Sequence, residues 1–98
     1  MNRDQALTEL QDCLSEIRAH GVRALYLFGS TARNTARDDS DVDMFIEAEQ
    51  ADRFNAFDLI DVKTILEKRL DAHVDLTMRD GLHPRLRGQI EREAIRVF

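Results

Sequence analysis

Two aspartates separated by one residue are the side chains of this sequence best suited to carry out chemistry. Residues 41–47 alternate between two faces, and Asp41 and Asp43 share one face because side chains at i and i+2 of a strand point the same way. Bare like charges repel, whereas Mg²⁺ is held by one or two carboxylates together with substrate phosphates. Two such ions, roughly 3.5–4 Å apart, clamp the attacking and leaving oxygens of an in-line displacement. The pair indicates a two-metal phosphoryl-transfer site; the alternative is two exposed aspartates at a strand edge.

A glycine–serine step precedes this pair and follows the β-prone segment Val22–Phe28. Gly29 allows the backbone to approach a ligand closely. The free N–H groups of a following helix, together with the Ser30 hydroxyl, can hold phosphate oxygens. The step is typical of a phosphate cradle, and an ordinary strand-to-helix turn is the alternative.

Three further side chains are candidates for the same site. Asp75 lies in a second alternating segment, and it completes a three-carboxylate site if that strand lies beside the Asp41 strand; otherwise it is a surface residue. Arg33 follows Ser30 by one helical turn and can reach a phosphate or pair with an aspartate of the site. Ser40 is a candidate nucleotide contact, although orienting the turn before Asp41 is the better interpretation.

The elements that must position these residues follow from hydrophobic periodicity. Helices are predicted over residues 3–20, 31–36 and 52–70, and from Pro84 through an apolar stripe that reaches Val97. Strands are predicted over residues 22–28, 41–47 and 73–78. This order predicts an α+β fold, an α/β sandwich in which a small mixed sheet of about three strands packs against helices in one domain over 1–98.

Several other side chains are interpreted as packing or surface residues rather than as part of a functional site. Cys13 falls among the apolar positions of the first helix and is expected in the core, as free cysteines usually are. Phe54 and Phe57, at i and i+3, are expected in the core rather than stacked on a base, and Tyr26 is assigned to packing. The histidines lack metal-ligand spacing and are interpreted as structural or surface residues: His20, His73 and His83.

Composition and charge limit the class of protein. The 98 residues carry a net charge of -5, which disfavours general binding to nucleic acid or to anionic membranes. A nucleotide remains a suitable ligand because bound divalent cations invert the local field. The longest apolar run, Ala24–Phe28, is too short to span a bilayer, and no signal-peptide pattern appears. A cytoplasmic protein is therefore expected.

The combined spacing resembles a known signature. Gly29-Ser30, ten residues and then Asp41-x-Asp43 match the nucleotidyltransferase pattern G-S-x10-D-x-D. Residues 27–33 and 40–43 resemble the minimal nucleotidyltransferase family, the MNT or MntA-like antitoxins of the DNA polymerase β superfamily. The resemblance continues through short matches at residues 57–61, 74–76, 84–86 and 92–94.

The resemblance implies a nucleotidyltransferase core and a role for each site residue. Gly29 and Ser30 would hold the β- and γ-phosphates of ATP. Asp41, Asp43 and Asp75 would be ligands of two Mg²⁺ ions, and Asp75 would also help to deprotonate the acceptor hydroxyl. Glycine usually follows the arginine of this motif, and here the residue is Asn34. Asparagine tolerates the left-handed conformation better than most residues.

Members of this family are commonly paired with a HEPN-domain toxin, an RNase, and transfer AMP to a tyrosine of that toxin. The resemblance thus implies metal-dependent transfer of AMP from ATP to a cognate toxin, with a hetero-oligomer as the expected assembly. The alternatives are an antitoxin that masks its partner without catalysis, which the Asn34 departure favours, and a transferase acting on a small molecule or an RNA end. Four arginines of the last helix region form either a docking surface or a solvated face: Arg85, Arg87, Arg92 and Arg96.

Overall fold

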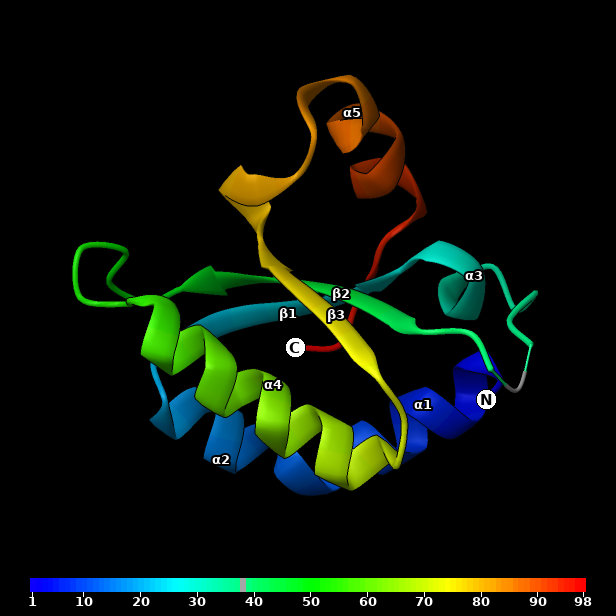
Figure 1. Ribbon diagram of the computed structural model, residues 1–98, viewed down its shortest axis with the longest axis horizontal. Coiled ribbons are helices and arrows are strands. Elements are labelled where there is room, and N and C mark those ends of the chain that lie inside the picture. Colours follow the sequence, from blue (N-terminus) through cyan, green and yellow to red (C-terminus); the bar gives the residue numbers. More distant parts are fainter. Residues whose placement is uncertain (38) are drawn as a thin grey trace.

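A four-stranded mixed sheet forms the centre of the molecule (Figure 1). The computed structural model describes residues 1–37 and 39–98. The strands, in the spatial order β3-β2-β1-β4, are β1 (Val22–Phe28), β2 (Val42–Ala48), β3 (Val74–Met78) and β4 (Ile95–Arg96). The helices are α1 (Arg3–Leu10), η1 (Gln11–Cys13), α2 (Leu14–Ala19), α3 (Gly29–Ala32), α4 (Ala56–Leu70), η2 (Arg79–Gly81) and α5 (Pro84–Glu93).

The predicted α+β fold with a small mixed sheet is confirmed. β1 runs antiparallel to β2, and β2 runs parallel to β3. No described helix has both the length and the apolar composition that a membrane crossing requires.

The sheet has one strand more than the sequence predicted. We expected the last helix to continue through Val97, but α5 ends at Glu93 and Ile95 pairs with Leu27 of β1. The Val97 N–H donates to the Leu25 carbonyl at 2.8 Å. The free edge of β1 offers backbone partners to an extended chain, and these hydrogen bonds outweigh another helical turn.

One face of the sheet carries the hydrophobic core. Helices α1, α2 and α4 all lie on this side (Figure 1), where Val42, Met44 and Ile46 point into the core as the alternation predicted. The first predicted helix is split into α1, η1 and α2 but keeps its buried stripe, and Cys13 is in the core as expected. Burial raises the pKa of the Cys13 thiol, and the side chain packs within the core cluster.

The prediction for α4 was wrong in two respects. The helix begins at Ala56, because the Asn55 side chain accepts hydrogen bonds from two N–H groups of the first turn and Asp58 completes a capping box. Its buried stripe is Val62, Leu66 and Leu70. Phe57 therefore lies on the outer face and is 78% exposed rather than part of the core. Ile60, another apolar residue of the helix, is 57% exposed, whereas Phe54 packs partly buried against the core as predicted.

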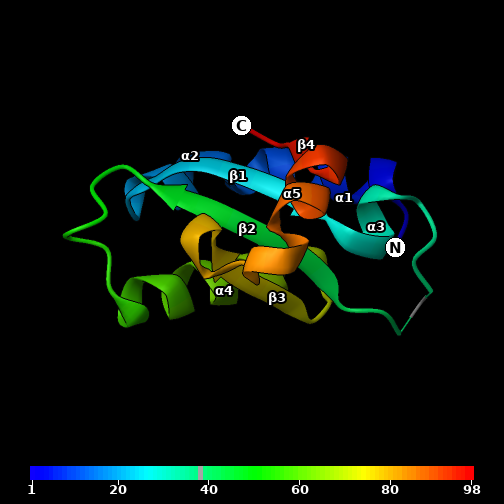
Figure 2. The same cartoon turned by 90° about the horizontal axis from the view of Figure 1, so that it is seen from above.

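The opposite face of the sheet carries an aromatic row beneath α5. Phe45 is fully buried and stacks on Tyr26 with ring centroids 4.6 Å apart, which confirms the packing role of Tyr26. The Arg79 guanidinium lies over both rings, 5.4 Å from the Tyr26 centroid and 5.7 Å from that of Phe45. Figure 2, which looks onto this face, shows α5 in front of the sheet.

Candidate functional site

Three aspartates lie near one another at one end of this second face, where Asp41 and Asp75 act electrostatically on Asp43. Asp43 of β2 and Asp75 of β3 are register partners in the parallel pair, so both side chains stand on the same face of the sheet. Asp41 lies just before β2, which begins one residue later than predicted because the Val42 N–H opens the ladder by donating to the His73 carbonyl. Asp41 and Asp75 are exposed, and Asp43 is half-buried. The structure thus brings the three predicted carboxylates to one edge.

Gly29 sits directly against the middle carboxylate. It begins α3 with a φ of 72°, a left-handed value that L side chains rarely adopt. A Cβ on this residue would overlap Asp43 Oδ2 and lie 3.1 Å from Asp43 Cγ. Only glycine fits here, so the turn after β1 and the carboxylate of β2 are in van der Waals contact.

The pKa of the Asp43 carboxyl is raised, which indicates that the site has too little positive charge to stabilise its ionised form. Burial raises the pKa of this carboxyl first, and the neighbouring carboxylates of Asp75 and Asp41 raise it further. The Arg33 guanidinium works in the opposite direction and lowers the pKa. An ionised Asp43 therefore gains from any cation placed among the three carboxylates.

The donor set fits a hard divalent cation only in part. Carboxylate oxygens are the ligands that Mg²⁺ prefers, and the charge deficit at Asp43 favours such an ion. Among the described residues, however, no three acidic, histidine or cysteine side chains form a complete metal-binding group. Mg²⁺ characteristically takes its remaining ligands from water and substrate phosphates, so phosphate oxygens would have to complete the coordination here.

The predicted phosphate cradle is a compact turn. Ser30 is half-buried on α3, and its carbonyl accepts the Thr35 N–H at 2.8 Å. The Arg33 N–H donates to the Gly29 carbonyl at 3.0 Å and closes the helix after Ala32, four residues earlier than expected. Asn34 then stops it with a φ of 62°.

Asn34 occupies the position at which the family pattern usually has glycine. It adopts the left-handed conformation that the sequence predicted it would tolerate. Its side-chain Oδ1 also accepts the Arg3 N–H at 3.1 Å, which ties the start of α1 to the cradle. The departure from the family pattern is therefore accommodated in the backbone.

Arg33 and Ser40 find partners within the chain. Arg33 Nη1 lies 3.0 Å from Glu93 Oε2 of α5, an ion pair with neither of the partners that the sequence suggested. The Ser40 Oγ accepts the Arg37 N–H at 3.0 Å, and the Ser40 N–H donates to the Arg37 carbonyl. Ser40 thus orients the turn that leads to Asp41.

The histidines behave as structural or surface residues. His83 caps α5, because its Nδ1 accepts the Arg85 N–H at 3.2 Å. His20 Nδ1 lies 2.9 Å from the Glu16 carbonyl oxygen, and His73 is exposed beside Glu67. Pro84 occupies the first turn of α5 as expected.

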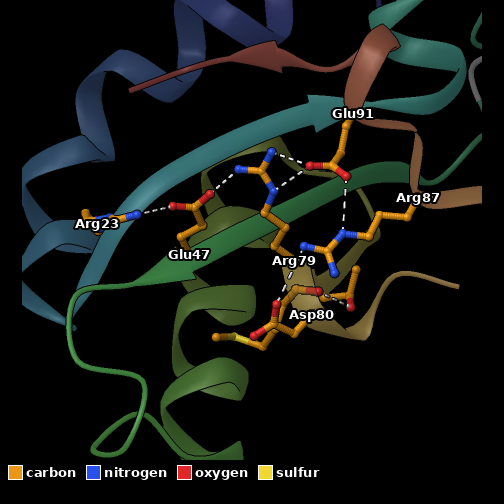
Figure 3. Close-up of polar contacts among 8 residues, drawn as sticks. Arg23, Glu47, Arg79, Asp80, Arg87 and Glu91 are labelled. Carbon is orange, nitrogen blue, oxygen red and sulfur yellow. Dashed lines mark hydrogen bonds and ion pairs between the residues drawn. The ribbon is translucent and has the colours of Figure 1, made fainter. Parts of the chain in front are cut away.

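A network of ion pairs that the sequence did not predict holds α5 over the sheet. Arg79 pairs with Glu47 of β2 and with Glu91 of α5, while Glu47 also pairs with Arg23 and Glu91 with Arg87 (Figure 3). No residue of α5 is buried, so these ion pairs replace apolar contact. The sequence contains 33 charged residues (14 basic plus 19 acidic), and no local pattern distinguishes these from the rest.

The fold and this edge of carboxylates define the class of protein. A sequence model of the nucleotidyltransferase domain matches residues 7–97, and the chain belongs to that family. The solved structure of a proposed minimal nucleotidyltransferase is 37% identical, covers 97% of this chain and 95% of its own, and superposes with a TM-score of 0.82. The protein is a nucleotidyltransferase with the minimal form of the fold.

Its relatives narrow the class further. The protein adenylyltransferase MntA of Thermococcus cleftensis is 32% identical over 94% of this chain and 99% of its own length. The proposed protein adenylyltransferase MJ0435 of Methanocaldococcus jannaschii is 36% identical over 81% of this chain and 83% of its own. A solved complex of a tri-AMPylated HEPN toxin with MNT antitoxin from Shewanella oneidensis shares the fold at 20% identity, with a TM-score of 0.67 over 98% of this chain and 71% of that chain.

Proposed function

We propose that this protein transfers AMP from ATP to a hydroxyl of a partner protein, and that this hydroxyl belongs to a tyrosine of a cognate HEPN-domain toxin. The observation that supports this best is the register pairing of Asp43 with Asp75 beside the Gly29 turn. Nucleotidyl transfer requires carboxylates beside a turn that binds phosphate, and the Gly29 turn, to which we assign this role, lies against Asp43.

In this proposal the chain's own residues hold and orient the reactants. The N–H groups and hydroxyl of the Gly29–Ser30 turn bind the β- and γ-phosphates, and Arg33 adds positive charge beside them. The acceptor oxygen forms a bond to the α-phosphorus while the bond to the departing pyrophosphate oxygen breaks. Asp75, the more exposed carboxylate of the register pair, receives the hydroxyl proton.

The same carboxylates would hold the cofactor. Asp41, Asp43 and Asp75 are the proposed ligands of two Mg²⁺ ions, and the nucleotide phosphates complete the coordination. Bound there, the ions would lower the pKa of the acceptor hydroxyl and neutralise charge on the leaving pyrophosphate. The pKa of Asp43 is raised first by burial and then by the carboxylates of Asp75 and Asp41, and a cation among the three would offset both effects.

The proposed partner rests on the relatives. One is named as a protein adenylyltransferase, and a chain of the same fold is part of a complex between an antitoxin and an AMPylated HEPN toxin. We propose the same arrangement for this protein, with the toxin presenting its hydroxyl at the exposed carboxylate edge. The alternative, an antitoxin that masks its partner without catalysis, is favoured by Asn34, but this residue adopts a left-handed backbone conformation that glycine also adopts readily.

A co-expression experiment tests this proposal. The protein is produced together with a HEPN-domain protein encoded beside its gene, and the mass of that partner is measured. We expect added mass in units of AMP on a tyrosine with the wild type, and none with Asp41→Asn. Transfer that survives this substitution would contradict the proposed metal role. Protection of cells by an Asp41→Asn/Asp43→Asn variant that adds no AMP would favour masking.

A further inference from the structure

Arg33, beside the phosphate cradle, is held by a residue from the far end of the chain. Its Nη1 lies 3.0 Å from Oε2 of Glu93, in the last turn of α5. The other oxygen of Glu93 accepts a hydrogen bond from Gln89 Nε2 at 3.3 Å, one helical turn earlier. Gln89, Glu93 and Arg33 thus form a chain of contacts from α5 to α3.

Arg33 is placed where a nucleotide would arrive. It caps the C-terminus of α3, and its N–H bonds to the carbonyl of Gly29, the residue that touches Asp43. Its positive charge acts on Asp43, whose pKa it lowers. The side chain is 49% exposed, so solvent and a ligand can reach it.

The ion pair uses only part of the guanidinium. An arginine carries five N–H donors in a planar fork, and the contact with Glu93 engages Nη1. Within the described residues, Arg33 has no second carboxylate partner at ion-pair distance. The remaining donors are available for phosphate oxygens, which arginine binds well because its planar fork matches their spacing.

We propose that Glu93 is a positioning residue, which holds Arg33 with its free N–H groups turned toward the phosphates of the bound nucleotide, and that Gln89 orients Glu93. The proposal rests on the proposed function and adds α5 to the nucleotide site. A long side chain that is already ordered loses less rotamer freedom on binding than a mobile one. The opposite possibility is that Glu93 competes with phosphate for Arg33. Removing Glu93 would weaken ATP binding if it positions Arg33 and would strengthen ATP binding if it competes.

The binding of ATP with MgCl₂ to the purified protein, measured by titration calorimetry, distinguishes them. We expect Glu93→Ala to weaken ATP binding roughly tenfold, within the range for coupled neighbouring groups. Gln89→Ala should weaken it less. The double variant Arg33→Ala/Glu93→Ala should bind no more weakly than Arg33→Ala alone, because Glu93 acts through Arg33.

A charge-swapped pair distinguishes two roles of Glu93: positioning Arg33 for the nucleotide, or only holding α5 against α3. Arg33→Glu/Glu93→Arg restores an ion pair across the two helices. Its melting temperature should therefore be closer to that of the wild type than the melting temperatures of the single variants Arg33→Glu and Glu93→Arg are. ATP binding should stay weak, because a carboxylate now faces the phosphates. Asp12→Ala is the matched control: it breaks another exposed arginine–carboxylate pair, with Arg69, away from the site, and should leave ATP affinity unchanged.

Four results would overturn the inference: unchanged ATP binding by Glu93→Ala, tighter ATP binding by Glu93→Ala, additive losses in the double variant, or recovery of ATP binding by the charge swap. If the wild type itself does not bind ATP, the proposed function fails. If the wild type binds ATP and Glu93→Ala binds it equally well, only the role of Glu93 fails.

Discussion

Asp43 and Asp75 are register partners in the parallel ladder between β2 and β3, on the face of the sheet opposite the helical core. The neighbouring register pair, Val42 and Val74, is buried on the core side. The same strands therefore carry apolar side chains into the core and carboxylates to the open face. A slip of one residue would exchange the two sets, so core packing fixes the position of the site.

Replacing Asp43 with asparagine should make the fold more stable. Its pKa is raised by burial and by two neighbouring carboxylates, so the ionised form is unfavourable in the folded state. This penalty is fully present above the folded pKa and disappears below the ordinary aspartate value of 3.8. Without divalent cations, Asp43→Asn should melt a few degrees higher than the wild type near neutral pH. The two should melt alike in acid below that value.

The exposed loop residue Asp52 provides a control for this comparison. Asp52→Asn removes one negative charge without touching the site, and it should leave the melting temperature nearly unchanged. A lower melting temperature for Asp43→Asn at neutral pH would show that the carboxylate is compensated in the folded protein.

Gly29→Ala should damage both stability and nucleotide binding. The new methyl group would overlap the Asp43 carboxylate, and the left-handed backbone itself costs on the order of 1–3 kcal/mol for a residue other than glycine. Gly88→Ala is the matched control, because its Cβ would meet only Arg92 Nη1, at 3.5 Å, within α5. That variant should gain about 0.5–1 kcal/mol from better helix propensity. Urea unfolding measures both, and equal stabilities for the two variants would contradict the contact.

The ion-pair network under α5 should make stability depend on pH in the opposite sense to Asp43. Hydrogen bonds from Arg23 and Arg79 lower the pKa of Glu47. Its contribution is therefore complete above the ordinary glutamate value of 4.5 and is lost as the pH falls through the lower folded value. The melting temperature of the wild type should exceed that of Glu47→Gln near neutral pH, and the gap should close in acid.

Glu49→Gln, on an exposed neighbouring residue, controls for the loss of one negative charge. Its melting temperature should follow that of the wild type at every pH. A gap between Glu47→Gln and the wild type that persists unchanged in acid would contradict the role of charge in the network.

Two phenylalanines should respond very differently to truncation. Phe45 is fully buried in the aromatic row, and Phe45→Ala should lower the free energy of unfolding by about 3–5 kcal/mol. Phe57 is 78% exposed, and Phe57→Ser should change the free energy of unfolding by no more than about 0.5 kcal/mol. Chemical denaturation measures both, and a large loss for Phe57→Ser would place that ring in the core.

Local patterns predicted the elements that have a periodicity of their own. The alternation of residues 41–47 and 73–78 was sufficient to place Val42 and Val74 in the core and Asp43 and Asp75 on the other face. The phase of α4 was harder, because its capping box starts the helix at Ala56 and the side facing the core is set by Val62 onward. An apolar residue in the first turn could not be assigned to either side from the sequence.

The features that were missed depend on contacts between distant residues. β4 exists because the edge of β1 supplies hydrogen bonds to Ile95 and its neighbours, whereas residues 94–97 also fit a helical stripe. Nothing local in the sequence distinguishes Glu93 or Arg79 from other charged residues. Glu93 pairs with Arg33, 60 residues away, and Arg79 pairs with Glu47, 32 residues away. Their importance appears only once α5 is placed over the sheet.

The most direct test of the central claim determines which phosphorus of ATP is transferred to the partner. The protein is incubated with Mg²⁺, its HEPN-domain partner and ATP labelled at either the α- or the γ-phosphorus. Nucleotidyl transfer at the aspartate edge predicts label on the partner from α-labelled ATP alone, release of pyrophosphate, and no transfer by Asp43→Asn or Asp75→Asn. Label from the γ-phosphorus, or transfer of the α-label that persists in those variants, would contradict the account.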